Sequence, residues 1–188
     1  MPVKQLQQYL DEAGVEYVCQ QHPETFTAKE LASHVQVAGD QVAKTVIVEL
    51  DGKMAMLVMP ATWRVHWDRL MRELETDFVE LADEQEFLDC FPDCELGAMP
   101  PFGNLFGMSV YCAESLTSQP DIAFAAGSHT ESVHMKTSDF LELVKPVVIS
   151  RGFTEPGRKK PSWLVRRKGE ASLSAMGADS RNSEMGGY

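Results

Sequence analysis

The sequence of 188 residues lacks the features of a membrane protein or a secreted protein. No apolar run approaches the roughly 18–20 residues that a membrane-spanning helix needs. The first residues lack the apolar stretch of a secretion signal, so the four cysteines are expected to be reduced thiols. These absences predict a cytoplasmic protein without a membrane partner.

Motifs for metals and nucleotide cofactors are also missing. The chain has no CxxC or HExxH pattern, no glycine-rich phosphate loop and no dinucleotide fingerprint. His129 and His134 lie five residues apart in one expected strand, so their side chains should face opposite sides of the sheet. Pro92 lies between Cys90 and Cys94 and argues against one helical face. We therefore expect neither a metal nor a cofactor.

Positive charge is scarce in most of the chain. Residues 1–150 contain 9 Lys and Arg against 24 Asp and Glu, a net charge of −15, whereas residues 151–188 contain 8 against 4, a net charge of +4. Phosphate contacts come mainly from Lys and Arg, so this acidic body is not expected to coat DNA or a long duplex. A nucleic acid should instead be bound over a short stretch, at one of its ends, or through the basic segment at residues 151–188.

The patterns that are present indicate one α+β domain. Residues 42–50 and 54–59 are strand-like and flank Asp51-Gly52, a type I′ turn signal that predicts a hairpin. Apolar spacing and the Thr27–Glu30 capping box predict short helices. The helices are expected at residues 4–13, 28–34, 67–74, 83–88 and 137–144, the last capped by Thr137, and further strands at 15–18, 108–112, 122–125, 129–135 and 146–149.

The composition changes after Ser150, where Gly, Ser, Arg and Lys dominate. Too little apolar surface remains there to offset the entropy of an ordered chain. We therefore divide the chain into a domain at residues 1–150 and a basic, mobile tail at residues 151–188.

Lys44 is the most informative single residue. It lies in the middle of a predicted strand, on the same face as Val42, Val46 and Val48. Two interpretations remain open. The lysine stem can follow an apolar surface to water, or its amine can point into a cleft and bind an anion or polarise a carbonyl.

Two loops are further candidates. Residues 97–103 combine two prolines with two glycines, so this rigid loop can present its N–H groups to an oxyanion or simply connect two elements. Residues 125–131 form a small-residue turn that leads to His129. Cys94 is a candidate nucleophile if a histidine lies beside it, but free cysteines are more often buried apolar groups.

Together these segments resemble the YbaK/ProX superfamily of bacterial editing domains, the group that includes the prolyl-tRNA synthetase insertion domain. The resemblance covers roughly residues 5–148. It is carried in order by His22 with Thr27, Ala28 and Glu30, and by residues 42–48, 97–103 and 124–129. It implies a mixed, largely antiparallel sheet with a barrel-like core and surrounding short helices.

The resemblance also implies an activity, namely a trans-editing hydrolase that deacylates mischarged aminoacyl-tRNA. The partner would be the acceptor end of the tRNA, with an aminoacyl-tRNA synthetase as a further partner. Lys44 corresponds to the functional lysine of the family, and Gly97 opens its GxxxP loop. These two are the predicted catalytic residues, and the predicted substrate-binding residues are Thr27, Ala98, Met99, Pro100, Pro101, Gly127, Ser128 and His129.

Two other functions stay open at this point. One is a non-catalytic module that binds aminoacyl-tRNA or a synthetase, and the other is a thiol hydrolase that uses Cys94. The basic tail, with Trp163 among its Arg and Lys residues, would either grip tRNA outside the site or only increase solubility.

Overall fold

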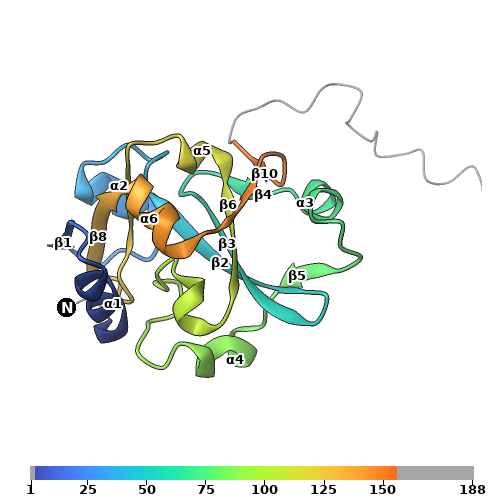
Figure 1. Ribbon diagram of the computed structural model, residues 1–188, viewed down its shortest axis with the longest axis horizontal. Helices are drawn as coiled ribbons and strands as arrows, with labels where there is room; N and C mark the ends of the chain where they lie inside the picture. The colour runs from blue at the N-terminus through green and yellow to red at the C-terminus, as the bar shows by residue number, and fades with distance from the viewer. Residues whose placement is uncertain (1–2, 156–188) are drawn as a thin grey trace, which may run out of the picture. The chain divides into compact units, whose positions relative to one another are not determined.

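The computed structural model describes residues 3–155 as a mixed α+β domain with three sheets (Figure 1). The largest sheet has the strand order β5-β2-β3-β6-β9, the second the order β1-β8-β7, and the third pairs β4 with β10. The strands are β1 (Tyr17–Gln21), β2 (Ala43–Leu50), β3 (Lys53–Pro60), β4 (Arg64–Val65), β5 (Val79–Leu81), β6 (Ser109–Ala113), β7 (Asp121–Ala125), β8 (Glu131–Lys136), β9 (Val147–Ile149) and β10 (Phe153–Thr154). This confirms the predicted fold class.

The sheets do not close into a barrel within residues 3–155. The prediction of a barrel-like core is therefore wrong, and the core lies instead against the two larger sheets, which are open and adjoin each other. Most pairs are antiparallel, but β6 runs parallel to both β3 and β9. The two larger sheets meet where Val42, just before β2, forms a parallel bridge with Ala123 of β7. The start of β2 therefore lies at the junction of the two sheets.

The predicted hairpin is confirmed. Strands β2 and β3 pair over their whole length, with Lys44 opposite Met59. Asp51 and Gly52 have φ angles of 48° and 79°, the two positive values that a type I′ turn requires. The hairpin therefore forms the centre of the largest sheet.

Short helices cover the sheets at the positions that the sequence indicated. They are α1 (Lys4–Ala13), α2 (Ala28–Val35), α3 (Trp67–Leu74), α4 (Glu84–Phe87), α5 (Glu114–Thr117) and α6 (Thr137–Val144), with 3₁₀ turns at Leu88–Cys90 and Gly103–Phe106. Helix α5 was not predicted. The prediction that Thr137 caps α6 is wrong, because Lys136 is the N-cap and the Thr137 hydroxyl is buried without a partner. None of these helices is long and apolar enough to cross a membrane.

Alternate residues of β2 face different apolar clusters. Ala43 and Ile47 belong to the largest core cluster, whereas Val48 belongs to a second cluster with Leu70 and Phe153. The alternation that the sequence predicted is therefore present, and Lys44 lies on the Val48 face at the end of the strand.

The ordered part of the domain continues past the boundary that we predicted at residue 150. Strand β10 pairs with β4, and Phe153 is buried at 5% exposure in the second cluster. At least five more residues therefore belong to the domain. The remaining tail residues, including Trp163, lie outside the described part of the chain, so the tail stays a prediction.

Candidate functional site

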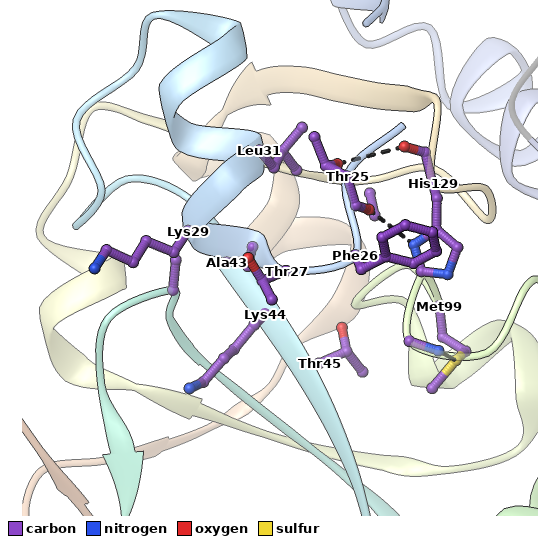
Figure 2. A pocket seen from close by; sticks show the side chains of 14 residues that line it. Thr25, Phe26, Thr27, Lys29, Leu31, Ala43, Lys44, Thr45, Met99 and His129 are labelled. Carbon is purple, nitrogen blue, oxygen red and sulfur yellow. Dashed lines mark hydrogen bonds between the residues drawn. The ribbon is translucent and has the colours of Figure 1, made fainter. Parts of the chain in front are cut away.

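A pocket of about 350 Å³ lies between the start of β2, the N-terminal end of α2 and two loops (Figure 2). Its walls combine small apolar side chains with threonines and three basic side chains. The lining residues are Thr25, Phe26, Thr27, Ala28, Lys29, Leu31, Ala43, Lys44, Thr45, Ala61, Gly97, Met99, Ala125 and His129. Five of the ten predicted site residues are among them: Lys44, Gly97, Thr27, Met99 and His129.

The capping box of α2 fixes one wall of the pocket. The Thr27 hydroxyl accepts a hydrogen bond from the Glu30 N–H at 3.1 Å. The Glu30 carboxylate in turn accepts the N–H groups of Phe26 at 3.0 Å and Thr27 at 3.2 Å. Helix α2 therefore orders the segment before it, as a capping box does. This role of Glu30 follows from the sequence signal alone.

Lys44 is the second residue of β2 and lines the pocket from the start of that strand. Its ammonium group donates a hydrogen bond to the Trp63 carbonyl, and the side chain is half-buried. Burial lowers the pKa of Lys44, and the nearby charge of Arg64 lowers it further. The structure thus supports the interpretation of an amine at a cleft rather than one that only follows the surface to water.

The charge of the pocket is opposite to that of the domain. Lys29, Lys44 and His129 line it, and no Asp or Glu is among the fourteen lining residues. Figure 2 shows the Lys29 and Lys44 amines on the same side, away from His129. Lys29 is exposed on the first turn of α2 and was not predicted as a site residue. Such a pocket favours an anionic ligand and offers no carboxylate as a general base.

His129 links the two loops that border the pocket. Its Nδ1 lies 2.9 Å from the Thr25 carbonyl oxygen and its Nε2 lies 2.8 Å from the Leu96 carbonyl oxygen. Both partners can only accept, and a neutral imidazole has one donor. Both contacts are therefore hydrogen bonds only when the ring carries its second proton.

Phe26 is an exposed aromatic ring on the rim of the pocket. It is 66% exposed, and its centroid lies 5.0 Å from that of the His129 ring. The sequence did not single it out, because its signal was only a large apolar residue next to a helix cap. The exposed ring is suited to stacking on a planar ligand group.

The loop at residues 97–101 is rigid but has few free donors. Gly97 has a φ of +85°, and its N–H is directed at the Met99 sulfur at 3.3 Å. The Ala98 N–H donates to the Glu95 carbonyl at 3.0 Å. Pro100 and Pro101 have no N–H. The N–H groups of Gly97 and Ala98 are therefore engaged within the loop, and the role of the loop toward an oxyanion stays a prediction.

The other five predicted residues lie behind the pocket wall or beside it. Ala98, Pro100 and Pro101 are buried. The Gly127 N–H donates to the Ala98 carbonyl at 2.9 Å, which joins the turn to the loop, while the Ser128 hydroxyl lies 3.3 Å from that of Thr130. These residues shape the pocket without lining it.

Cys94 is poorly suited to nucleophilic catalysis. Burial raises its pKa to about 11, with a smaller contribution from the charge of Asp93. The reactive form of a cysteine is the thiolate, which this environment disfavours. Cys94 is also not among the pocket residues. Within residues 3–155 no three His, Cys, Asp or Glu side chains are grouped so as to hold a metal ion.

An α+β domain with a small basic pocket at the junction of two sheets describes many proteins and does not by itself identify a family. Sequence comparison is more specific. The family model described as aminoacyl-tRNA editing domain matches residues 22–143, more than half of the chain. The protein therefore belongs to the aminoacyl-tRNA editing domain family, which confirms the resemblance to YbaK/ProX-type domains.

Solved structures share this fold. The hypothetical protein APE2540 is 18% identical with a TM-score of 0.70, and the match covers 78% of this chain and 98% of that one. A candidate trans-editing enzyme for prolyl tRNA synthetase is 20% identical with a TM-score of 0.69, covering 79% and 95%. A search of curated protein sequences finds no match.

Proposed function

We propose that this protein hydrolyses the ester bond of mischarged aminoacyl-tRNA in trans. The single observation that carries the proposal is the basic pocket with Lys44 at its edge. It occurs in a member of the editing domain family whose residues 1–150 carry a net charge of −15. An aminoacyl-tRNA acceptor end joins a small amino acid to phosphate-rich RNA. The phosphates match a pocket that is lined by Lys29 and Lys44 and by no Asp or Glu.

The proposed reaction is hydrolysis of an ester, which requires the protein mainly to position the substrate and a water molecule. The oxygen of a water molecule attacks the ester carbonyl carbon, the bond from that carbon to the ribose oxygen breaks, and the ribose oxygen takes up the proton that water loses. The products are free amino acid and tRNA. Because the ester is already activated, positioning of substrate and water supplies most of what is required. No lining carboxylate is available as a base, so the substrate's own groups would carry the proton.

Lys44 is assigned to hold the terminal phosphate or ribose. Its ammonium group needs only charge and reach to bind phosphate, and the Trp63 carbonyl keeps it at the pocket edge. Phe26 is assigned to the terminal base, which would stack on the exposed ring. Met99 and Gly97, which also line the pocket, are assigned to the amino acid. A synthetase is a further partner under this proposal.

The experiment is a deacylation screen over a panel of mischarged tRNAs, with release of free amino acid as the readout. We expect the full-length protein to release at least one amino acid. We expect Lys44→Ala to lose most of that activity and remain folded, since the half-buried side chain makes one hydrogen bond, to the Trp63 carbonyl, and the loss of one such bond costs about 1 kcal/mol. Lys53→Ala, an exposed lysine on the same hairpin, is the matched control.

The alternative functions give different results in the same screen. A non-catalytic binding module would bind charged tRNA without releasing amino acid. A thiol hydrolase would lose its activity with Cys94→Ala and keep it with Lys44→Ala. Wild-type turnover by the Lys44→Ala variant would remove Lys44 from the proposal.

A further inference from the structure

The arginines of the domain are concentrated in one place. Residues 3–155 contain four arginines: Arg64 on β4, Arg69 and Arg72 on α3, and Arg151 just before β10. Figure 1 shows these three elements close together. The rest of the domain is strongly acidic, and its cations are lysines, two of which line the pocket described above.

Three of the four arginines line one surface cavity of about 400 Å³, together with Glu73 and Ser150. We call Arg69, Arg72 and Arg151 the arginine patch. Arg69 and Arg72 are three residues apart on α3 and therefore share a face of the helix. Arg151 reaches the same cavity from the turn between β9 and β10.

Glu73 holds that turn against the helix. Its carboxylate accepts hydrogen bonds from the Ser150 N–H at 2.8 Å, the Ser150 hydroxyl at 3.0 Å, the Arg151 N–H at 2.8 Å and the Gly152 N–H at 2.9 Å. A side chain at Gly152 would come within 2.7 Å of the Leu70 Cδ1 atom. The approach of Arg151 to α3 is thus built into the packing.

The guanidinium groups of the patch are available to a ligand. Within residues 3–155, none of the three makes an ion pair, and the Nε of Arg72 donates to the Asp68 carbonyl. Glu73 is the one carboxylate in the cavity, and its oxygens already accept four hydrogen bonds. Arg72 also lines a second cavity, which contains Asp68, Glu75 and Asp77. In the cavity of the patch itself, the three arginines share the lining with one carboxylate, Glu73, which already accepts four hydrogen bonds.

We propose that the arginine patch binds backbone phosphates of the tRNA acceptor arm, outside the pocket that takes the acceptor end. Guanidinium groups bind phosphate through paired N–H donors. The patch is also connected to the pocket along the chain. Lys44 donates to the Trp63 carbonyl, Arg64 follows, and α3 begins at Trp67. The inference rests on the proposed function for the identity of the RNA, and an acidic segment of a protein partner is the alternative occupant.

The test measures binding of uncharged tRNA to the full-length protein by fluorescence anisotropy between 50 and 200 mM salt. We compare wild type with Arg69→Gln/Arg72→Gln and with Arg151→Gln. The control, Lys4→Gln/Lys53→Gln, removes two exposed charges elsewhere. If each arginine of the double variant makes one phosphate contact, the log–log salt slope should fall by roughly 1.4–1.8 in total. Affinity near physiological salt should fall roughly tenfold, and the control should match wild type.

Uncharged tRNA carries no ester, so this result does not depend on hydrolysis. If tRNA binding depends on the patch but no amino acid is released, the proposed hydrolysis is contradicted and the proposed role of the patch is supported.

If amino acid is released but wild type and the double variant have equal salt slopes, the proposed role of the patch is contradicted and the proposed hydrolysis is supported. Thermal unfolding of each variant checks folding. An unchanged slope together with weakened binding to an acidic synthetase would assign the patch to a protein partner instead and so also overturn the proposal.

Discussion

Gly97 and Cys94 lie three residues apart and have opposite expected roles. Gly97 lines the pocket with a φ of +85°, which L side chains rarely adopt, and a side chain there would meet the His129 ring at 3.5 Å. Cys94 lies outside the pocket with a raised pKa. We expect Gly97→Ala to reduce deacylation substantially and Cys94→Ala to leave it near wild type. Activity in Gly97→Ala with inactivity in Cys94→Ala would favour the thiol hydrolase.

Iodoacetamide provides an independent check on the same pair of residues. Because burial disfavours the Cys94 thiolate, alkylation at neutral pH should be slow and should not inactivate the protein. Rapid inactivation that Cys94→Ala abolishes would contradict this assignment.

Phe26 tests how the substrate base is held. We expect Phe26→Ala to raise KM for aminoacyl-tRNA about 5- to 150-fold, because stacking of a base on an aromatic ring contributes about 1–3 kcal/mol. Phe26→Tyr should restore most of the affinity. Phe78→Ala is the control, since Phe78 is similarly exposed at 45% and lies outside the pocket. An equal KM in Phe26→Ala and wild type would show that the ring does not contact substrate.

At the scale of elements, the contact between α3 and the β9–β10 turn should depend on pH. Burial acts to raise the pKa of Glu73, but hydrogen bonds from Ser150, Arg151 and Gly152 outweigh it and lower the pKa below its ordinary value of 4.5. A carboxyl with a lowered pKa stabilises the folded state fully above its ordinary value. That contribution disappears as the pH falls through the lowered value.

We therefore expect Glu73→Gln to destabilise the protein by about 1 kcal/mol at pH 7. The difference from wild type should shrink as the pH falls below 4.5. Urea unfolding at pH 7 and pH 3 measures both quantities. A difference that stays constant with pH would show that the ionised carboxylate does not hold the turn.

At the scale of the whole molecule, the end of the folded domain can be located by truncation. The sequence predicted a folded domain that ends at residue 150, but Phe153 is buried and β10 pairs with β4. A chain that ends at residue 150 should be destabilised by about 1.5–3 kcal/mol through the absence of Phe153 alone, and Glu73 would be left without two of its partners. A chain that ends at residue 155 should match the full-length protein in Tm.

The same truncations bear on the basic tail. If the tail contacts tRNA, removal of residues after 155 should weaken binding and flatten its salt dependence, by roughly 0.7–0.9 in slope for each phosphate that the tail would otherwise neutralise. If it only increases solubility, binding should not change. Turnover at saturating substrate should survive in both cases, because Lys44 and Gly97 precede the tail.

Local signals in the sequence determined several elements of this protein. The Asp51-Gly52 turn, the Thr27–Glu30 capping box and the alternation along residues 42–48 each depend on neighbours within a few residues, so they could be predicted. The same local patterns, in their order along the chain, carried the resemblance to editing domains. They placed Lys44, Gly97 and His129 in one site before any tertiary contact was known.

Tertiary structure decided what depends on residues far apart in the chain. The bridge from Val42 to Ala123 joins the two larger sheets, and the Phe26 ring contacts that of His129, 103 positions later in the chain. Segments about 80 residues apart also meet where Phe153 packs in the cluster of Leu70 and where the Arg151 N–H donates to the Glu73 carboxylate. Sequence spacing carries no information about such contacts, because they depend on how the sheets pack rather than on the period of a helix or strand.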